Sequence, residues 1–388
     1  MNVLLFSPHF PANYYQFASA LRRNGANVLG LGDAPYESLR MELRVALSEY
    51  YRVDNMHDYD QLLRACGYFT HRYGKLERIE SHNEYWLQTD ARLRTDFNVP
   101  GPKDADILWG KQKSRMKQIF TQAGIAVARG AVVHTLETAH ELIAQTGYPI
   151  VAKPDVGVGA AATYKIHNTQ ELESFFATRP AIDYMLEEFI QGDLYSFDGL
   201  TDRDGHIVFH TSHYFSQGIM ETVNEGRDLF YYSMRDLPIG LEDVGRRAVA
   251  GFGLRERFFH IEFFQVAPGR WVALEVNMRP PGGLTMDMFN YANDRDLYQQ
   301  WANIVTFNSH DLVGERPYHC AYVGRKQALP HCLPHTEILS RYGAFIVHHE
   351  AINPVLAPAI GDYGYLLRSP HLAELEPIIA DMVRVAAQ

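Results

Sequence analysis

The 388-residue sequence contains only three cysteines, Cys66, Cys320 and Cys332, too few for a disulfide framework in a chain of this length. Basic residues are also scarce: 36 Lys and Arg stand against 46 Asp and Glu, which gives a net charge of −10. A protein that binds a nucleic-acid backbone normally has a basic excess or a basic tract. Nucleic acid is therefore not an expected partner.

No apolar run approaches the roughly 20 residues that span a bilayer. The first eight residues, MNVLLFSP, lack the basic flank and the long apolar core of a signal peptide. With 46% hydrophobic and 21% charged residues, the composition is that of a folded globular protein. We expect a soluble, cytoplasmic protein, without a membrane partner, that is long enough for two or three domains.

The first hundred residues predict small βα units. Residues 3–6 and 28–31 are apolar runs that indicate buried strands, and the helical spacing of residues 14–24 ends at Gly25. This order implies parallel strands joined by a right-handed crossover. The first strand is followed by SPHF instead of a glycine-rich turn, so we predict no nicotinamide site.

Two prolines and a glycine in residues 98–102 predict a loop and a domain boundary. Beyond a helix at 113–123, a compact α+β module is expected, with helices capped by Thr135 and Asn168 around a strand at 150–153. Residues 184–277 are rich in strands, and the tail ends in a helix near 372–386. We expect a βα domain at 1–104, a central domain at 105–311 with a lid at about 130–186, and an α+β region at 312–388.

One predicted hairpin carries the strongest local indication of chemistry. Its strands, residues 258–266 and 271–277, are joined by the turn APGR. If the turn closes as a two- or four-residue loop, Glu262 lies opposite Glu275 and His260 opposite Asn277 on one face. Two carboxylates placed about 4.5–5.5 Å apart at Cβ repel each other, and apolar neighbours raise the cost of leaving them unpaired. A hard divalent cation such as Mg²⁺ relieves that repulsion, whereas a solvated face with incidental glutamates is the alternative.

Three other segments have the residue types of an anion-binding site. Arg279 is followed by a rigid turn, PPGG, in which Gly282 and Gly283 offer bare backbone amides for phosphate or carboxylate oxygens. Lys153 ends a buried strand and faces the Gly/Ala-rich loop 155–162, which can lie close over phosphates. A basic cluster surrounds Lys113. Taken singly, each segment has an ordinary alternative. The PPGG segment can be a surface turn, the Gly/Ala-rich loop a flexible hairpin, and the basic cluster a solvated helix face.

Taken in order, these motifs resemble the ATP-grasp superfamily of carboxylate-activating ligases. The order is Lys113, Lys153 with its Gly/Ala loop, the run LEEFIQG at 186–192, Glu262, and the motif E-x-N-x-R at 275–279. The resemblance covers about residues 100–311, and residues 1–104 resemble the βα domain that usually precedes this fold. It implies an α/β (α+β) ATP-grasp fold with an N-terminal parallel βα domain, a small α+β lid and a C-terminal mixed sheet region.

The resemblance also implies a role for each motif. The residues expected to contact ATP are Lys113, Lys153, Gly157 and Gly159 at the phosphates, Glu187, Glu188, Phe189 and Ile190 at adenine, and Asp193 near the ribose. Glu187 is expected near the exocyclic amine, and Asp193 stands in for an acidic ribose ligand because residue 194 is Leu. The expected ligands of one or two Mg²⁺ ions, for which Mn²⁺ can substitute, are Glu262, Glu275 and Asn277. Arg279 is expected to steady the transferred phosphoryl group.

Other candidates rest on weaker patterns. Arg227 and His260, together with Gly282 and Gly283, are weak candidates for substrate contacts. A separate group, His319, Cys320, His331, Cys332 and His335, matches no common zinc-ligand spacing.

The activity implied by the resemblance is that of an ATP-dependent, ADP-forming carboxylate–amine ligase that works through an acyl-phosphate. Amide or peptide-bond formation between amino acids is the first choice. The alternatives are a bicarbonate- or carbamate-activating enzyme and a non-catalytic ATP-binding regulator. The expected partners are ATP and small carboxylate and amine substrates, and a homodimer is compatible with the resemblance.

Overall fold

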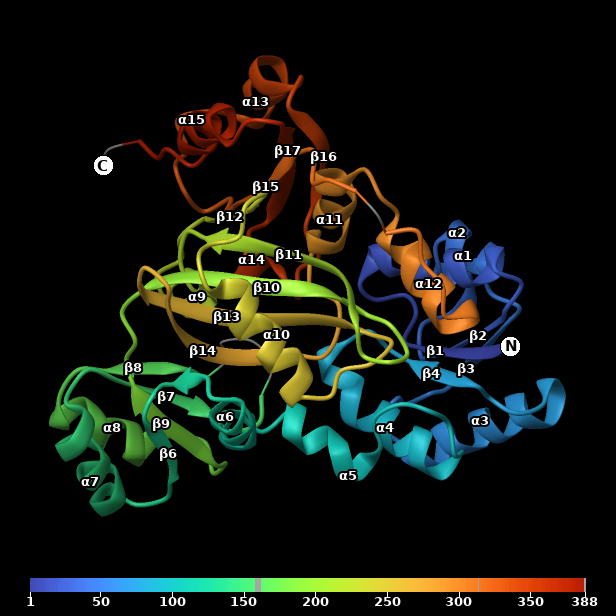
Figure 1. Cartoon of the computed structure of the whole chain (residues 1–388), viewed down its shortest axis with the longest axis horizontal. Helices are drawn as coiled ribbons and strands as arrows, with labels where there is room; N and C mark the ends of the chain where they lie inside the picture. The colour runs from blue at the N-terminus through green and yellow to red at the C-terminus, as the bar shows by residue number, and fades with distance from the viewer. Residues whose placement is uncertain (158–161, 313, 387–388) are drawn as a thin grey trace.

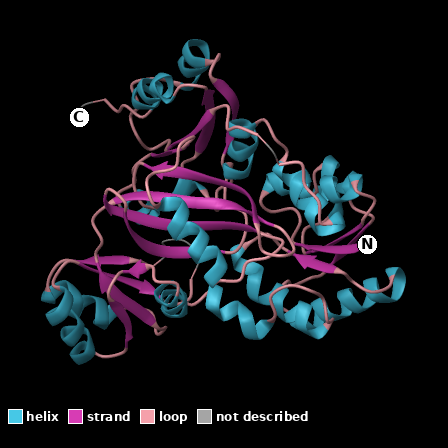
Figure 2. Cartoon of the chain, in the orientation of Figure 1, coloured by secondary structure: helices cyan, strands magenta, loops and turns pink. Residues whose placement is uncertain are grey.

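The computed structural model describes residues 1–157, 162–312 and 314–386. These residues form three β-sheets with helices packed around them (Figures 1 and 2). Among the described residues, no helix combines the length and the apolar character needed to cross a bilayer.

A four-stranded parallel sheet of order β3-β2-β1-β4 forms the N-terminal unit. Its strands and helices are β1 (Asn2–Phe6), α1 (Tyr15–Arg23), β2 (Asn27–Gly32), α2 (Met41–Ala46), β3 (Glu49–Arg52), α3 (Tyr59–Tyr73), β4 (Arg78–Glu80) and α4 (Leu87–Asp96). Val3 lies opposite Val28 in the parallel pair of β1 and β2, which confirms the predicted βα order. All five residues of β1 are buried, as expected for a parallel sheet covered by helices.

A second, antiparallel sheet of order β6-β9-β7-β8 carries two helices and lies at the lower left of Figure 1. Its elements are β6 (Gly130–Val133), α7 (Leu136–Thr146), β7 (Ile150–Pro154), β8 (Tyr164–Ile166), α8 (Thr169–Thr178) and β9 (Tyr184–Glu188). The side chains of Thr135 and Asn168 accept hydrogen bonds from Thr138 N–H and Glu171 N–H. Both predicted helix caps and the predicted strand are thus confirmed. We call this unit the small sheet.

The central sheet has nine strands in the order β16-β17-β15-β12-β11-β10-β13-β14-β5. Its strands are β5 (Ala126–Val127), β10 (Asp193–Thr201), β11 (Ile207–Phe215), β12 (Leu229–Ser233), β13 (Phe258–Ala267), β14 (Arg270–Asn277), β15 (His319–Arg325), β16 (Ile346–Ala351) and β17 (Tyr363–Ser369). The C-terminal strands join the central ones through the antiparallel pair of β12 and β15. One sheet therefore extends from the middle of the chain into its C-terminal region.

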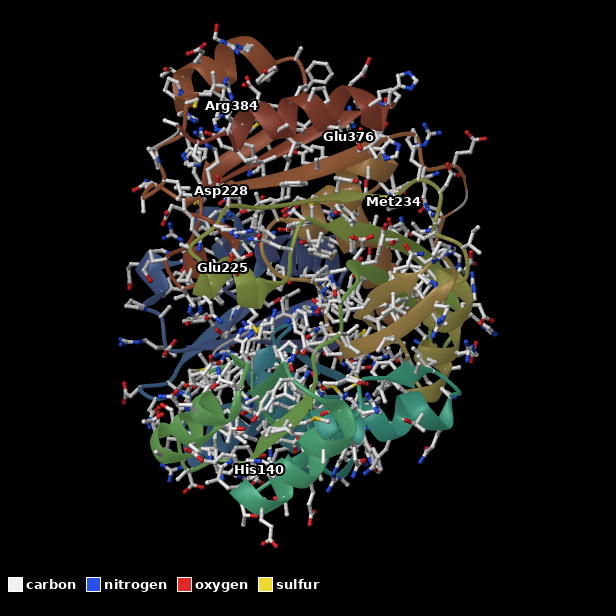
Figure 3. All side chains as sticks on the ribbon, turned by 90° about the vertical axis from the view of Figure 1, so that its left-hand side faces the viewer. His140, Glu225, Asp228, Met234, Glu376 and Arg384 are labelled. Carbon is white, nitrogen blue, oxygen red and sulfur yellow. The ribbon has the colours of Figure 1, made fainter. Side chains whose placement is uncertain are left out.

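Helices connect and cover the sheets. They are α5 (Asp104–Ile107), α6 (Lys113–Gln122), α9 (Ile219–Asn224), α10 (Leu241–Gly251), α11 (Thr285–Asn293), α12 (Leu297–Phe307), α13 (His335–Tyr342), α14 (Ala357–Ile360) and α15 (Leu372–Met382). The last helix ends four residues before the expected residue 386. Seen from the side, the C-terminal helices lie at one end of the molecule and α7, with His140, lies at the other (Figure 3).

The N-terminal unit shares a hydrophobic core with the central part of the chain. Phe17 of α1 packs edge-on against Trp301 of α12 and against Phe258 of β13, with ring centroids 5.2 and 6.1 Å apart. Trp301 is fully buried and also contacts His82. Figure 1 shows α12 beside α1 and α2. This packing fixes the N-terminal unit against the end of the central sheet.

We expect Trp301→Ala to lower the free energy of unfolding by about 3–5 kcal/mol, because it leaves a large cavity in this shared core. Chemical denaturation monitored by circular dichroism measures the change. On the same helix, Phe307 is 60% exposed, so Phe307→Ala should change stability by less than about 0.5 kcal/mol. Equal effects of the two substitutions would contradict the shared core.

Candidate functional site

A cleft of about 350 Å³ lies between the small sheet and the central sheet. Residues of both sheets and of the segment that joins them line it, among them Lys113, Lys153, Glu187, Ile190, Asp193, Phe264, Glu262 and Glu275. The lining thus combines apolar side chains with charged ones of both signs. The structure brings the predicted phosphate-binding, hinge and metal-binding motifs to this one cleft.

The predicted register of the hairpin β13–β14 is confirmed. Glu262 pairs with Glu275 and His260 pairs with Asn277. The register shifts only between Glu262 and Phe263 and again near the turn, so the pairs that carry the acidic side chains are intact. Because side chains alternate along a strand, all four residues share one face of the central sheet.

Two lysines compensate the charge of Glu275. Burial favours the neutral acid, but Lys113 and Lys153 hold the pKa of the Glu275 carboxyl below its usual value, aided by a hydrogen bond from Asn277. The Asn277 amide donates to Glu275 Oε1 at 3.3 Å. Glu275 is therefore a carboxylate inside the cleft, with cationic side chains from α6 and β7 beside it.

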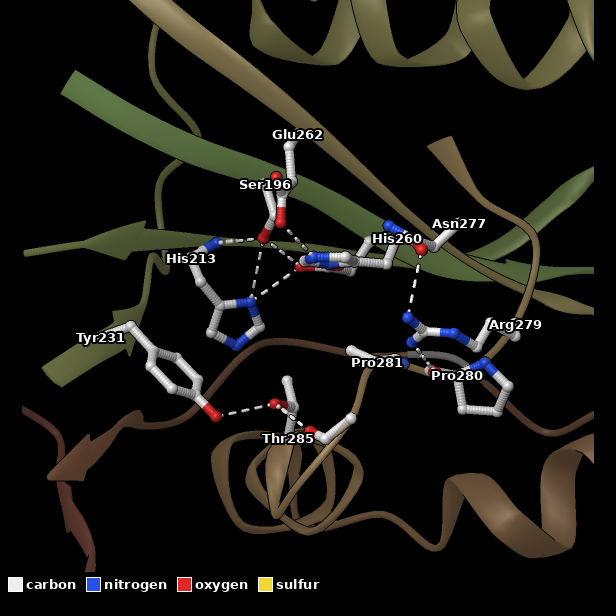
Figure 4. Close-up of polar contacts among 12 residues, drawn as sticks. Ser196, His213, Tyr231, His260, Glu262, Asn277, Arg279, Pro280, Pro281 and Thr285 are labelled. Carbon is white, nitrogen blue, oxygen red and sulfur yellow. Dashed lines mark hydrogen bonds and ion pairs between the residues drawn. The ribbon is translucent and has the colours of Figure 1, made fainter. Parts of the chain in front are cut away.

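Arg279 is held by three acceptors. Its guanidinium donates to Glu84 Oε2 at 3.2 Å. It also donates to the carbonyl of Pro280 at 2.8 Å and to Asn277 Oδ1 at 3.1 Å (Figure 4). Glu84 is almost completely buried, and burial raises its pKa although Arg279 opposes the shift. Glu84 lies 195 residues before Arg279, and no local motif in the sequence marks it.

The turn after Arg279 is fixed from the N-terminal unit. Tyr14 donates its hydroxyl hydrogen to the carbonyl of Pro281 at 3.2 Å, and the Asn13 amide donates to the carbonyl of Gly283 at 3.3 Å. Gly283 has φ +62°, a conformation that favours glycine, and Thr285 Oγ1 donates to the carbonyl of Gly282. Figure 4 shows Thr285 bonded in turn to Tyr231. The turn is thus a fixed part of the site.

The N-terminus of α6 places Lys113 over the end of β7. The backbone N–H and the hydroxyl of Ser114 both donate to the Asp155 carboxylate, at 2.8 and 2.9 Å. Asp155 therefore satisfies a free helix N–H from outside the helix. The Lys113 ammonium donates to the carbonyl of Gly157 at 3.4 Å, whereas Gly159 lies outside the described residues.

Glu187 lines the cleft, and its side chain has two charged partners. Its carboxylate is buried between two ammonium groups, Lys153 Nζ at 2.5 Å and Lys117 Nζ at 2.7 Å. Burial opposes ionisation, but Lys153 and Lys117 keep the pKa of Glu187 below its usual value. Because each carboxylate oxygen forms an ion pair with a lysine, Glu187 orients Lys153, and its expected contact with the adenine amine stays a prediction.

The connection between the two sheets carries the remaining expected nucleotide contacts. Glu188 forms an ion pair with Arg129 at 2.6 Å, Lys165 Nζ lies 3.6 Å from the centre of the Phe189 ring, and Asp193 is exposed at the start of β10. Glu188, Phe189, Ile190 and Asp193 all line the cleft. A Cβ at Gly192 would lie 2.6 Å from the carbonyl oxygen of Gln265, so only glycine fits where the connection crosses β13.

A buried polar network lies next to Glu262. His260 Nδ1 is hydrogen-bonded to Asp198, His260 Nε2 lies 3.0 Å from Glu262 Oε1, and His213 Nδ1 lies 2.8 Å from Asp198 Oδ2 (Figure 4). Burial favours a neutral His260, but Asp198 and Glu262 raise the pKa of His260 to about 10. Both ring nitrogens of His260 are therefore engaged, and the geometry does not support the expected substrate contact.

The other weak candidates lie outside the cleft lining. Arg227 is exposed and pairs with Glu225, which is labelled in Figure 3. In the proposed histidine and cysteine group, His319 Nδ1 faces the carbonyl of Ser233, His331 binds Asp228, and His335 binds the Tyr365 hydroxyl. These histidines thus have separate partners instead of a common centre.

The acidic end of the cleft suits a hard cation. Glu262 and Glu275 each have one carboxylate oxygen without a hydrogen bond among the described residues. Asn277 Oδ1 accepts from Arg279 and retains a second lone pair. Three oxygen donors on adjacent strands, two of them anionic, fit Mg²⁺ or Mn²⁺.

Comparisons with known proteins agree with this geometry. The ATP-grasp domain family matches residues 146–287. Over 252 residues the chain is 24% identical to the L-arginine-specific L-amino acid ligase of Bacillus subtilis, which covers 62% of this chain and 60% of that protein. Over 196 residues it is 29% identical to the carbamoyl phosphate synthase large chain of Clavibacter michiganensis, which covers 46% of this chain and 17% of that protein.

Solved structures share the whole architecture. The L-amino acid ligase from Bacillus licheniformis superposes with a TM-score of 0.76 at 16% identity, over 100% of this chain and 98% of that one. The N5-carboxyaminoimidazole synthetase from Staphylococcus aureus gives a TM-score of 0.74 at 14% identity, over 98% and 97% of the two chains. The expected resemblance and fold class are confirmed: residues 146–287 match the ATP-grasp domain family, and the chain has the ATP-grasp fold.

The ion pairs of Lys117 and Lys153 with the buried Glu187 carboxylate can be tested by substitution. We expect Lys117→Met to lower the free energy of unfolding by about 1–3 kcal/mol, because it removes one of the two ammonium groups that form ion pairs with a buried carboxylate. Denaturant titration measures the loss. Lys75→Met, at an exposed position, is the matched control. Unchanged stability of Lys117→Met would mean that Lys153 alone compensates Glu187.

Proposed function

We propose that this chain, which has the ATP-grasp fold, is an ATP-dependent, ADP-forming carboxylate–amine ligase that works through an acyl-phosphate. The observation that carries the proposal is the opposed pair Glu262 and Glu275, which shares one cleft with Lys113 and Lys153. The cleft lies between two sheets, where a nucleotide can be enclosed. The names of the relatives, ligases and synthetases, support the same class of enzyme.

In this proposal the apolar part of the cleft lining, near Ile190 and Phe264, takes the adenine ring. Lys113 and Lys153 lie at the end where the phosphates would be, because that end holds the acidic cation-binding residues. Glu262, Glu275 and Asn277 would hold Mg²⁺, which supplies neutralisation of phosphate charge when it is bound. The number of ions and the use of Mn²⁺ stay predictions.

The first chemical step joins the substrate carboxylate to phosphorus. A carboxylate oxygen attacks the γ-phosphorus in line, the bond from that phosphorus to the ADP oxygen breaks, and an acyl-phosphate forms. Lys113, Lys153 and Arg279 balance the negative charge that spreads over the phosphoryl oxygens. Since Glu84, Pro280 and Asn277 hold the guanidinium of Arg279, it needs no reorganisation during the step.

The second step forms the amide. The amine nitrogen attacks the acyl carbon, the carbon–oxygen bond to phosphate breaks, inorganic phosphate leaves and the nitrogen loses a proton. Because water would hydrolyse the acyl-phosphate, the site must be closed during this step. The small sheet, which carries Lys153 and lies across the cleft from Glu275, is the unit that we propose to close.

We propose amino acids as the carboxylate and amine substrates. The proposal rests on the ligases from Bacillus subtilis and Bacillus licheniformis, which are amino acid ligases by name. Phosphate release from ATP and Mg²⁺, measured across a matrix of carboxylates crossed with amines including the common amino acids, tests it. Release that requires one carboxylate and one amine, with ADP as product, is the expected result. Release with bicarbonate alone would favour the carboxylating alternative, and AMP as product would contradict the acyl-phosphate.

We expect Glu275→Gln to reduce ATP turnover about 100-fold or more, because the substitution removes a charge from the cation site without changing the side-chain size. Steady-state phosphate release at saturating ATP is the measurement. Glu173→Gln, on the exposed face of α8, should leave turnover unchanged. Full turnover in Glu275→Gln would exclude the proposed metal site.

A further inference from the structure

The buried polar network beside Glu262 takes no direct part in the proposed reaction. Its members are Ser196 and Asp198 on β10, His213 on β11 and His260 on β13. Asp198 and Ser196 are fully buried, and His213 is 1% exposed. A buried network of this kind costs free energy unless every polar group has a partner, so its position beside the cation site calls for an explanation.

Strand register places the network on the same face as the cation site. Across β10 and β13, Asp198 lies opposite His260 and Ser196 lies opposite Glu262. Across β10 and β11, Ser196 lies opposite His213. With His260 opposite Asn277 and Glu262 opposite Glu275, four neighbouring strands turn their polar side chains to one face.

Both carboxylate oxygens of Asp198 already have hydrogen-bond partners. One carboxylate oxygen, Oδ1, binds His260 Nδ1, and the other, Oδ2, binds Ser196 Oγ and His213 Nδ1. No oxygen of Asp198 faces the cleft, since the residue has no exposed surface. Asp198 therefore cannot contact a cation or a substrate in the cleft, and its action on the site must pass through His260.

His260 links Asp198 to the cation site. Its two ring nitrogens face a carboxylate oxygen each, Asp198 Oδ1 and Glu262 Oε1. A hydrogen bond therefore joins each ring nitrogen to one carboxylate oxygen. The contact at 3.0 Å fixes Glu262 Oε1 and leaves Glu262 Oε2 as the free oxygen.

We infer that His260, held by Asp198, is a positioning residue that fixes Glu262 for divalent-cation binding. Glu262 has three rotatable bonds and faces the like-charged Glu275, so without a partner its carboxylate would turn away from Glu275. The donated hydrogen bond keeps it in place. The inference rests on the proposed function, because that proposal makes Glu262 a cation ligand.

The partners that orient a metal ligand change metal affinity about 10–100-fold when they are removed. We therefore expect His260→Phe to raise the dissociation constant of Mn²⁺ in the complex with ADP by about 10–100-fold. Gln can donate one hydrogen bond, so His260→Gln should lose less. Asp198→Asn should weaken Mn²⁺ binding as well, although this substitution leaves His260 itself in the site. The affinity for ADP in EDTA should stay within about 2-fold, because none of these residues lines the adenine end of the cleft.

Two measurements on the full-length protein separate positioning from a general structural role. Electron paramagnetic resonance of free Mn²⁺ gives the Mn²⁺ affinity with ADP present, and calorimetry in EDTA gives the ADP affinity without metal. His348→Phe is the matched control, because His348 also binds a glutamate, Glu350 at 3.1 Å, but lies on β16 outside the cleft. Circular dichroism checks the fold of each variant. If His260→Phe does not fold, the same Mn²⁺ and ADP affinities are measured for His260→Gln and Asp198→Asn.

A double-mutant cycle makes the test specific to Glu262. If His260 acts through Glu262, His260→Phe should cause little further loss of Mn²⁺ affinity in a protein that already has Glu262→Gln. Unchanged Mn²⁺ affinity in a folded His260→Phe variant would overturn the inference, and so would equal losses of Mn²⁺ and metal-free ADP affinity. Wild-type protein that binds Mn²⁺ with ADP but ligates no carboxylate would contradict the proposed function and leave this inference standing.

Discussion

The close approach of two carboxylates, Glu262 and Glu275, is the constraint around which the site is built. Their strands pair in a register that sets like charges opposite each other in a largely apolar cleft. Such a pair is tolerated only when cations or hydrogen-bond donors compensate it. Lys113 and Lys153 do this for Glu275, and His260 does it for Glu262. The carboxylate oxygens that have no hydrogen bond among the described residues suit a divalent cation.

Ion pairs and hydrogen bonds to the charged residues of the site also link parts of the chain that are far apart in sequence. Lys153 is held by Glu187, which is held in turn by Lys117, so the small sheet and α6 meet at one buried carboxylate. Arg279 is held by Glu84 from the N-terminal unit, and the glycine turn that follows it is held by Tyr14. The shared aromatic core around Phe17 and Trp301 keeps that unit in place. The N-terminal unit therefore supports Arg279 and the turn that follows it.

Much of the fold could be predicted because its signals are local. The alternation of apolar residues along β13 and β14, with a short turn between them, predicts Glu262 opposite Glu275, and the two register shifts between the turn and this pair compensate each other. Thr135 and Asn168 mark helix starts because their side chains satisfy the free N–H groups of the first turn. Glu84 and Asp198 could not be found in this way. Each acts through a partner on another strand or another unit, and the sequence around it carries no motif for that contact.

The sequence by itself determined the order of the motifs, the strand that carries each of them and the opposed carboxylates, because these follow from spacing within short segments. Only the tertiary structure decided what each charged group faces. The sequence did not indicate that Glu187 lies between two lysines, or that His260 lies between Asp198 and Glu262. The physical reason is that the partner of a buried charge is chosen by the packing of several strands at once, and that packing depends on contacts between residues that are distant in the chain.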